Sequence, residues 1–528
     1  MLRPPTETHT PVHVRWAALI ALGAGLAGVL AFPRFGIWPM AFVSVGLLSI
    51  AVHGRRSQTG AWLGLLYGLA FFGPLLHWTG VYVGPVPWLI LAVTEAAYCA
   101  GMGAMLPVVQ RLPGAPVWVG ATWVLQEAVR GRWPFGGFPW GRLGFSQAES
   151  PLRWFAALGG APLVSFAVAL AGAALAAVTL YARSRSWQSV TLAAAALVAV
   201  PTFGAVLAWP LKPAPDRDGR TATIALVQGD VPDRGLDFNS RRRQVLDNHV
   251  QQTLQLAADI DAGRATRPSL VVWPENSSDI DPYTNADARA EIAQAVAAVQ
   301  APILVGAILD GPGDHIRNVG ILWSPAAGAG QTYTKRHPVP FAEYIPLRGL
   351  AKLVSSKVDL VSRDMAAGGG NGLLTDGPFP IGDVICFEVA YDGLVRSSVA
   401  AGAQLIVVQT NNATFGHSAE TYQQLAMSQL RAVEHGRTTV QVSTSGESAI
   451  IGPDGGIRMR SGDLFTPSRL VTDVPLRTGK TLATRWGPVP EYVLGASALA
   501  ALLVSVLHRR RRPMTPTGNT DTEEMVRA

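Results

Sequence analysis

Long apolar runs, most of them ending at basic residues, constrain the fold of this chain more than any other feature. Seven runs lie within residues 16–210 and one more within residues 490–508. They cover residues 16–32, 37–52, 62–78, 88–109, 117–129, 156–181, 190–209 and 492–507. A helix of about 20 apolar residues is long enough to cross a bilayer. We therefore expect a polytopic α-helical membrane domain with about eight spans.

The basic residues between the runs predict how the chain is oriented. Arg55-Arg56, Arg111 and Arg183 follow the second, fourth and sixth runs, and Arg509–Arg512 follow the last. Lys and Arg are enriched in cytoplasmic loops of membrane proteins. We therefore expect cytoplasmic tails at residues 1–15 and 509–528. The polar block at residues 221–476 is expected on the extracytoplasmic side.

Composition agrees with a membrane protein and argues against nucleic-acid binding. Apolar residues make up 49% of the chain and charged residues only 15%. The net charge of +7 comes from short clusters beside apolar runs. Nucleic-acid sites instead gather basic residues into one patch with aromatics. Of the two cysteines, Cys99 lies in an apolar run and Cys386 in the polar block, so we expect no disulfide between them.

The polar block alternates strand and helix patterns. Short apolar strands are expected at 222–227, 270–273, 303–309, 318–323, 381–385, 405–408 and 438–443, and helices at 240–260, 287–299 and 420–435. Short apolar strands buried on both faces and separated by helices are typical of a layered α/β domain.

Three motifs in this block carry residues with catalytic potential. LVVWPENSSD ends a strand near Glu275, QTYTKRHPVPFAEYIPL holds Lys335 and Glu343, and GDVICFEVAYDG holds Cys386. The thiol lies at a strand-to-helix elbow, where a helix N-terminus favours the thiolate. Considered one at a time, Glu275 is interpreted as an ordinary loop glutamate, Lys335 as a surface lysine and Cys386 as a structural cysteine. Together they supply a base, a cation for an oxyanion and a nucleophile.

This ordered set resembles the nitrilase superfamily of carbon–nitrogen hydrolases and acyltransferases over roughly residues 220 to 475. The resemblance implies an αββα sandwich. It implies Glu275 as proton acceptor, Lys335 as the oxyanion stabiliser, Cys386 as nucleophile and Glu343 as the support of Lys335. No metal or cofactor is expected.

A Gly- and Pro-rich segment, RGRWPFGGFPWGRLGFSQAESPLRW, follows the fifth run, and its PFGGFPW core resembles the membrane-domain motif of bacterial apolipoprotein N-acyltransferases. This resemblance implies a multi-pass protein of the bacterial cytoplasmic membrane. The implied reaction moves an acyl chain from a phospholipid to the N-terminal diacylglyceryl-cysteine of an apolipoprotein. It would proceed through a thioester on Cys386 by ping-pong kinetics. The expected partners are the phospholipid, the apolipoprotein and the bilayer.

Substrate contacts are expected near the nucleophile. The family carries an aromatic and a glutamate beside the cysteine, here Phe387 and Glu388. Phe341 and Tyr344 are candidate walls of an apolar pocket, and Arg142 is a candidate for the phospholipid head group. The segment 345–361 has apolar and basic residues, so it is a lid at the membrane interface or an ordinary surface helix.

Two positions depart from the family pattern. Thr414 stands where a tryptophan is common, and Phe238 is the only aromatic near Asp230, where the family often has a tryptophan. Both changes concern specificity. His417 is read as a structural histidine and stays outside the catalytic set. A membrane-bound nitrilase-like amidase that uses water as acceptor would need the same triad. The number of apolar runs argues against it, because a tether needs one helix.

Overall fold

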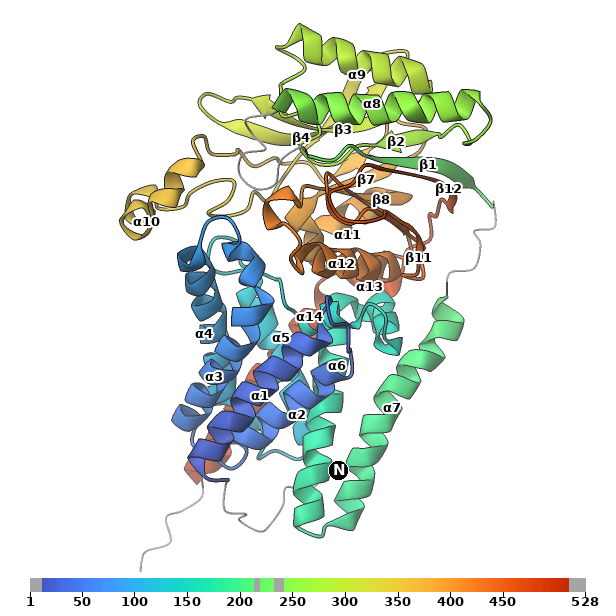
Figure 1. Ribbon diagram of the computed structural model, residues 1–528. Coiled ribbons are helices and arrows are strands. Elements are labelled where there is room, and N and C mark those ends of the chain that lie inside the picture. The colour runs from blue at the N-terminus through green and yellow to red at the C-terminus, as the bar shows by residue number, and fades with distance from the viewer. Residues whose placement is uncertain (1–11, 213–218, 232–241, 512–528) are drawn as a thin grey trace, which may run out of the picture.

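The computed structural model describes residues 12–212, 219–231 and 242–511, which form a helical bundle with a β-sandwich seated on one end (Figure 1). The long helices of the bundle are α1 (Val14–Ala31), α2 (Met40–Val52), α3 (Ser57–Leu75), α4 (Pro85–Val109), α5 (Ala115–Arg130), α6 (Phe155–Arg183), α7 (Trp187–Leu211) and α14 (Val489–Arg511). Three 3-10 helices cover its sandwich end: η1 (His77–Gly80), η2 (Leu143–Gln147) and η3 (Pro151–Trp154).

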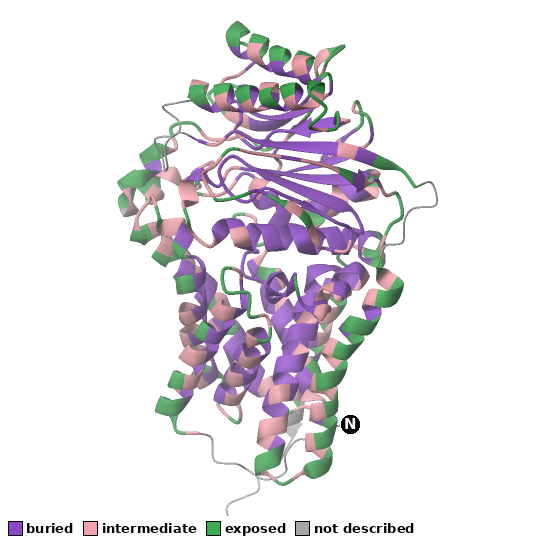
Figure 2. Ribbon diagram, turned by 45° about the vertical axis from the view of Figure 1, so that its right-hand side comes forward, coloured by how far each residue is buried: buried purple, intermediate pink, exposed green. Residues whose placement is uncertain are grey.

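Several of these helices have the length and composition of membrane spans. Five segments meet both criteria, and they belong to α1, α4, α6 with η3, α7 and α14. α2 is apolar but has only 13 residues. α7 leans away from the bundle, and its apolar side chains, such as Phe203 and Trp209, are exposed (Figures 1 and 2). Exposed apolar side chains on such helices suit a lipid environment.

α3 and α4 pack with their backbones close together. A Cβ atom added to Gly60 or Gly64 would collide with the backbone of Gly103 or Cys99 on α4. Small residues permit such close helix contacts in membranes. Cys99 therefore lies in a helix–helix interface.

The polar block forms two stacked six-stranded sheets. The first has the order β12-β1-β2-β3-β4-β5 and the second β11-β10-β9-β8-β7-β6. The strands of the first are β1 (Thr221–Gln228), β2 (Leu270–Val272), β3 (Ile303–Asp310), β4 (Ile316–Ser324), β5 (Gly328–Thr334) and β12 (Ser468–Pro475). Those of the second are β6 (Leu373–Leu374), β7 (Ile381–Ile385), β8 (Leu405–Thr410), β9 (Thr438–Ser443), β10 (Ala449–Ile451) and β11 (Ile457–Arg460).

Helices cover both outer faces of this pair of sheets (Figure 1). α8 (Arg242–Asp261) and α9 (Ala286–Val299) cover the first sheet, and α11 (Asp392–Ala401) and α12 (Glu420–His435) lie between the second sheet and the bundle. The predicted αββα sandwich is therefore confirmed. The short helices are α10 (Arg348–Val354), α13 (Leu482–Trp486), η5 (Ser356–Leu360), η6 (Cys386–Ala390) and η7 (Ala413–Phe415).

The sandwich and the bundle share one apolar core. Met427 and Leu430 of α12 and Phe387 of η6 belong to the same buried cluster as Trp140 and Phe145 of the bundle. Burial of apolar surface is the main favourable term in such packing. The helix η6, which begins with Cys386, is therefore held against the helical bundle.

Candidate active site

Cys386 lies at the junction of β7 and η6 and is partly exposed, whereas its neighbours Ile385 and Phe387 are buried. Its φ angle of 54° is in the left-handed region, which non-glycine residues seldom adopt. Strained backbone of this kind occurs at functional sites that the surrounding structure holds in place. Glu275 follows β2 and Lys335 follows β5 in the facing sheet.

Lys335 is held between the two glutamates. Its Nζ donates to Glu275 Oε1 at 3.0 Å and to Glu343 Oε1 at 2.7 Å. Burial alone would lower the pKa of Lys335, but Glu275 and Glu343 raise it well above its ordinary value. The ammonium therefore stays charged in a buried position, where it can donate to an oxyanion.

Both carboxylate oxygens of Glu275 have fixed donors. Asn318 Nδ2 lies 2.6 Å from Oε1, and the backbone N–H of Asn411 lies 2.9 Å from Oε2. Asn318 Nδ2 is also 3.3 Å from Glu343 Oε1, so it ties the two glutamates together. The sequence analysis missed this role of Asn318. The available signal was a polar residue inside the apolar strand β4.

The sulfur of Cys386 has two polar neighbours beyond the predicted set. Thr410 Oγ1 lies 3.2 Å and Gln424 Nε2 lies 3.7 Å from Sγ. Desolvation raises the pKa of the thiol above its ordinary value and Glu275 raises it further, whereas Lys335 lowers it. The expectation that the helix N-terminus favours a resting thiolate is therefore corrected. Burial and Glu275 favour the neutral thiol over the thiolate.

Glu388 is fully buried and surrounded by protein donors. Its Oε1 accepts from the backbone N–H groups of Arg336 at 2.7 Å and His337 at 3.1 Å, and Oε2 accepts from that of Ile385 at 2.9 Å. Tyr333 OH lies 3.0 Å from both oxygens. The structure thus places Glu388 between the Lys335 loop and the Cys386 loop, with its carboxylate occupied by the protein.

The aromatic candidates lie in two different places. Phe387 is buried and stacks on Trp140, with ring centroids 5.6 Å apart and an interplanar angle of 6°. It faces the bundle. Phe341 is 54% exposed and meets the ring of Phe135 edge-on at 5.9 Å. Tyr344 is half-buried beside it and accepts the Phe341 N–H at its carbonyl. Phe341 and Tyr344 are therefore more exposed than Phe387, and contact of these three residues with a substrate stays a prediction.

Arg142 is buried at the junction of bundle and sandwich. Its Nη1 donates to Asp392 Oδ2 at 2.8 Å, and its guanidinium lies 3.6 Å from Glu127 Oε2 and 3.9 Å from Glu491 Oε1. Arg431 pairs with the other oxygen of Asp392 at 2.7 Å. Arg142 therefore lies in a buried ion network, and its contact with a phospholipid head group stays a prediction.

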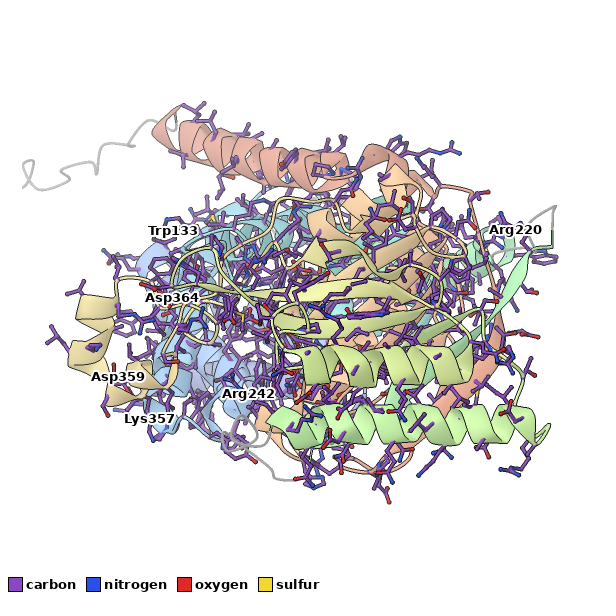
Figure 3. The ribbon with its side chains drawn as sticks, turned by 90° about the horizontal axis from the view of Figure 1, so that it is seen from above. Trp133, Arg220, Arg242, Lys357, Asp359 and Asp364 are labelled. Carbon is purple, nitrogen blue, oxygen red and sulfur yellow. The ribbon has the colours of Figure 1, made fainter. Side chains whose placement is uncertain are left out.

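The candidate lid segment projects beyond the edge of the sandwich. Figure 3 labels Lys357 and Asp359 on it, and α10 precedes them. Leu350 and Leu353 on α10 are 62% and 83% exposed. An apolar face without a protein partner fits an interfacial position. Of the remaining candidates, Thr414 lies in η7, His417 contacts the ring of Phe465, and Phe238 lies outside the described residues.

A cavity of about 750 Å³ lies where the bundle meets the start of α12. Its walls are mainly apolar and come from α1, α3, η1 and α4. Arg34 and His77 border it, and Gln423, the neighbour of Gln424, lines the sandwich side. Among the residues that the structure describes, no group of three His, Cys, Asp or Glu side chains is placed to bind a metal.

Comparison with known proteins agrees with this two-part architecture. The model of the apolipoprotein N-acyltransferase N-terminal domain matches residues 24–174, and the carbon–nitrogen hydrolase model matches residues 223–483. The apolipoprotein N-acyltransferase of Mycolicibacterium smegmatis is 43% identical over 93% of this chain and 85% of its own length. That of Azotobacter vinelandii is 30% identical over 94% of this chain and 95% of its own length. Among solved structures, an amidase from Nesterenkonia is 19% identical over 48% of this chain and 90% of its own, with a TM-score of 0.35. The chain therefore belongs to the apolipoprotein N-acyltransferase family, and its residues 223–483 match the carbon–nitrogen hydrolase domain.

Proposed function

We propose that this protein transfers a fatty acyl chain from a phospholipid to the N-terminal amine of a diacylglyceryl-cysteine in an apolipoprotein. The observation that carries the proposal is the location of the nucleophile. Cys386 opens η6, and the next residue, Phe387, stacks on Trp140 of the helical part. A site so close to the membrane helices suits substrates that are both anchored in a bilayer.

The first half-reaction forms a thioester. Glu275 takes the proton of the Cys386 thiol, and the sulfur attacks the ester carbonyl of the phospholipid. The Lys335 ammonium donates to the oxyanion of the tetrahedral intermediate. The intermediate collapses when the carbon–oxygen bond breaks. The lysophospholipid then leaves with the proton that Glu275 returns to its oxygen.

The second half-reaction forms the amide. The neutral amine of the apolipoprotein attacks the thioester carbonyl, and Lys335 again stabilises the oxyanion. Glu275 takes a proton from the attacking nitrogen. The carbon–sulfur bond breaks, and the proton on Glu275 returns to the Cys386 sulfur. Glu343 accepts from Lys335 throughout and so keeps the ammonium charged and in place.

The proposed substrates are anchored in a bilayer, so the protein should span that membrane with its sandwich on the side where the substrates lie. We infer about eight spans, with the sandwich on the extracytoplasmic side and both termini in the cytoplasm. The apolar cavity at the start of α12, which Arg34 and His77 border, would receive an acyl chain. An amidase would pass the acyl group to water. The extensive apolar helices are unnecessary for that reaction.

Mass spectrometry of a lipoprotein N-terminus tests the proposal. Cells that contain this protein as their only N-acyltransferase should yield triacylated N-terminal peptides, and cells with the Cys386→Ala variant should yield diacylated ones. Diacylated peptides in both strains, with the protein folded in the membrane, would contradict the proposed function.

A further inference from the structure

A buried polar cluster contacts the nucleophile from α12 and from the ends of β8 and β9. Its members are Thr410, Asn412, Glu420, Gln424 and Ser443, none more than 2% exposed. Desolvating polar groups is costly unless they are hydrogen-bonded. The members of this cluster are hydrogen-bonded to one another, and two of them, Thr410 and Gln424, also contact the Cys386 sulfur.

The side-chain amide of Gln424 has one orientation that its neighbours allow. Its Oε1 lies 3.0 Å from Asn412 Nδ2 and 2.9 Å from Thr410 Oγ1. Its Nε2 therefore occupies the other branch of the amide, 3.7 Å from Cys386 Sγ. Exchanging the two atoms would set two N–H₂ groups against each other at Asn412. The donor end of Gln424 thus faces the sulfur.

Asn412 is oriented in turn by the end of β9. Ser443 Oγ accepts the N–H of Gly446 at 2.8 Å and donates to Asn412 Oδ1 at 2.6 Å. The two hydrogens on Asn412 Nδ2 are then directed to Gln424 Oε1 and to Glu420 Oε2, the latter at 2.7 Å. Donation runs in one direction, from Ser443 through Asn412 and Gln424 to the sulfur.

This arrangement favours negative charge on the sulfur. A neutral thiol is a weak acceptor, and the distance of 3.7 Å is long for it. A thiolate attracts an N–H donor much more strongly, because hydrogen bonds to ions are shorter and stronger. Thr410 has a single hydroxyl proton, which serves either Gln424 or the sulfur. The Gln424 donor is available at the sulfur in either case.

We propose that Gln424 is a catalytic residue that stabilises the thiolate of Cys386, and that Asn412 is a positioning residue that keeps the amide in its donating orientation. The inference rests on the proposed thioester chemistry. Gln424 acts when Glu275 has taken the thiol proton, and again when the sulfur leaves the acylated amine.

The rate of Cys386 alkylation by iodoacetamide, followed at peptide level across pH, tests this on the full-length protein in detergent. Gln424→Met keeps the length of the side chain and removes its donor. A hydrogen bond to a charged group contributes about 1.5–3 kcal/mol, so alkylation near neutral pH should slow about tenfold or more. The midpoint of the pH profile should move upward by about one pH unit. Gln429→Met is the matched control, because Gln429 is a buried glutamine on the same helix that donates to Gly455 O.

Asn412→Asp is the second variant and probes the orientation of the amide. Replacing Nδ2 with oxygen removes the donor to Gln424 Oε1, so the alkylation profile should move in the same direction. The alkylation profile of the double variant should be shifted no further than that of Gln424→Met, because both changes act through the one contact between Gln424 and the sulfur. A folded Gln424→Met protein with the alkylation profile of the unsubstituted protein would overturn the inference. Alkylation needs no lipid, so it tests the role of Gln424 separately from acyl transfer. If Gln424→Met shifts the alkylation profile as expected but the unsubstituted protein transfers no acyl group, the proposed function is refuted and the role of Gln424 at the sulfur is not.

Discussion

Arg142, in the loop after α5, donates to Asp392, the first residue of α11, across 250 positions of sequence. Arg142 belongs to the helical part, and Asp392 begins the helix that follows η6, the 3-10 helix that starts at Cys386. Arg431 binds the second oxygen of Asp392 and also donates to the carbonyls of Val389 and Ala390 in η6. The bundle and the segment that begins at Cys386 are therefore linked by buried charges as well as by apolar packing.

Removing one member of this network should destabilise the protein strongly. Arg142→Gln removes the guanidinium that pairs with the buried Glu127 and with Asp392, and a broken buried ion pair costs about 3–5 kcal/mol. Thermal unfolding in detergent should show a clearly lower Tm. Arg458→Gln is the control, because its pair with Asp454 is partly exposed and contributes about 1 kcal/mol at most. Equal Tm values for the two variants would show that the network has no such role.

Glu343 should act through Lys335. Glu343→Gln removes a negative charge 2.7 Å from Nζ, which lowers the Lys335 pKa because Glu343 helps to raise it. The alkaline limb of the kcat profile should therefore move to lower pH, and kcat should fall about 10- to 100-fold. Asp359→Asn, which changes the exposed partner of Lys352, is the control and should change neither the alkaline limb nor kcat. An alkaline limb that stays in place in Glu343→Gln would contradict this role.

Glu420 should make stability depend on pH in a defined direction. Burial, with a contribution from Glu275, raises the pKa of Glu420 from 4.5 to about 8. The folded state thus binds this proton more tightly than the unfolded state, so stability falls as pH rises from about 4.5 to about 8.

Glu420→Gln should remove that dependence and keep an acceptor for Asn412. The Tm of Glu420→Gln minus the Tm of the unsubstituted protein should increase as the pH rises from about 5 to about 8. The comparison cancels other groups that titrate in this range, such as Asp279. A constant Tm difference across the range would mean that Glu420 does not bind a proton there.

The sequence predicted the positions of Glu275, Lys335 and Cys386 in the fold better than it predicted their surroundings, for a physical reason. Glu275 and Lys335 end strands of one sheet and Cys386 ends a strand of the other, and strand ends are recognisable from apolar periodicity. The helix expected at 420–435 has those bounds in the structure. The burial of Arg142 was not predictable, because its three carboxylate partners come from α5, α11 and α14. Such contacts depend on how distant segments pack, which local patterns do not encode.

The orientation of the sandwich has its own test. The basic clusters predict that residues 221–476 lie outside the cytoplasm and that the segment after Arg512 lies inside it. A reporter active only outside the cytoplasm should therefore work when fused after Trp209 and fail when fused after Arg512. Activity in the reverse pattern would contradict both the topology and the lipoprotein substrate.

The central claim, acyl transfer through a Cys386 thioester, is tested most directly by counting lysophospholipid released per protein. Purified protein given phospholipid alone should release about one equivalent and hold the acyl group on Cys386, because the acceptor is missing. A diacylated lipopeptide with a free N-terminal amine should restart release, and its N-acetylated form should not. The Cys386→Ala variant should release none. Continuous release of free fatty acid without any amine would identify a hydrolase and contradict the account.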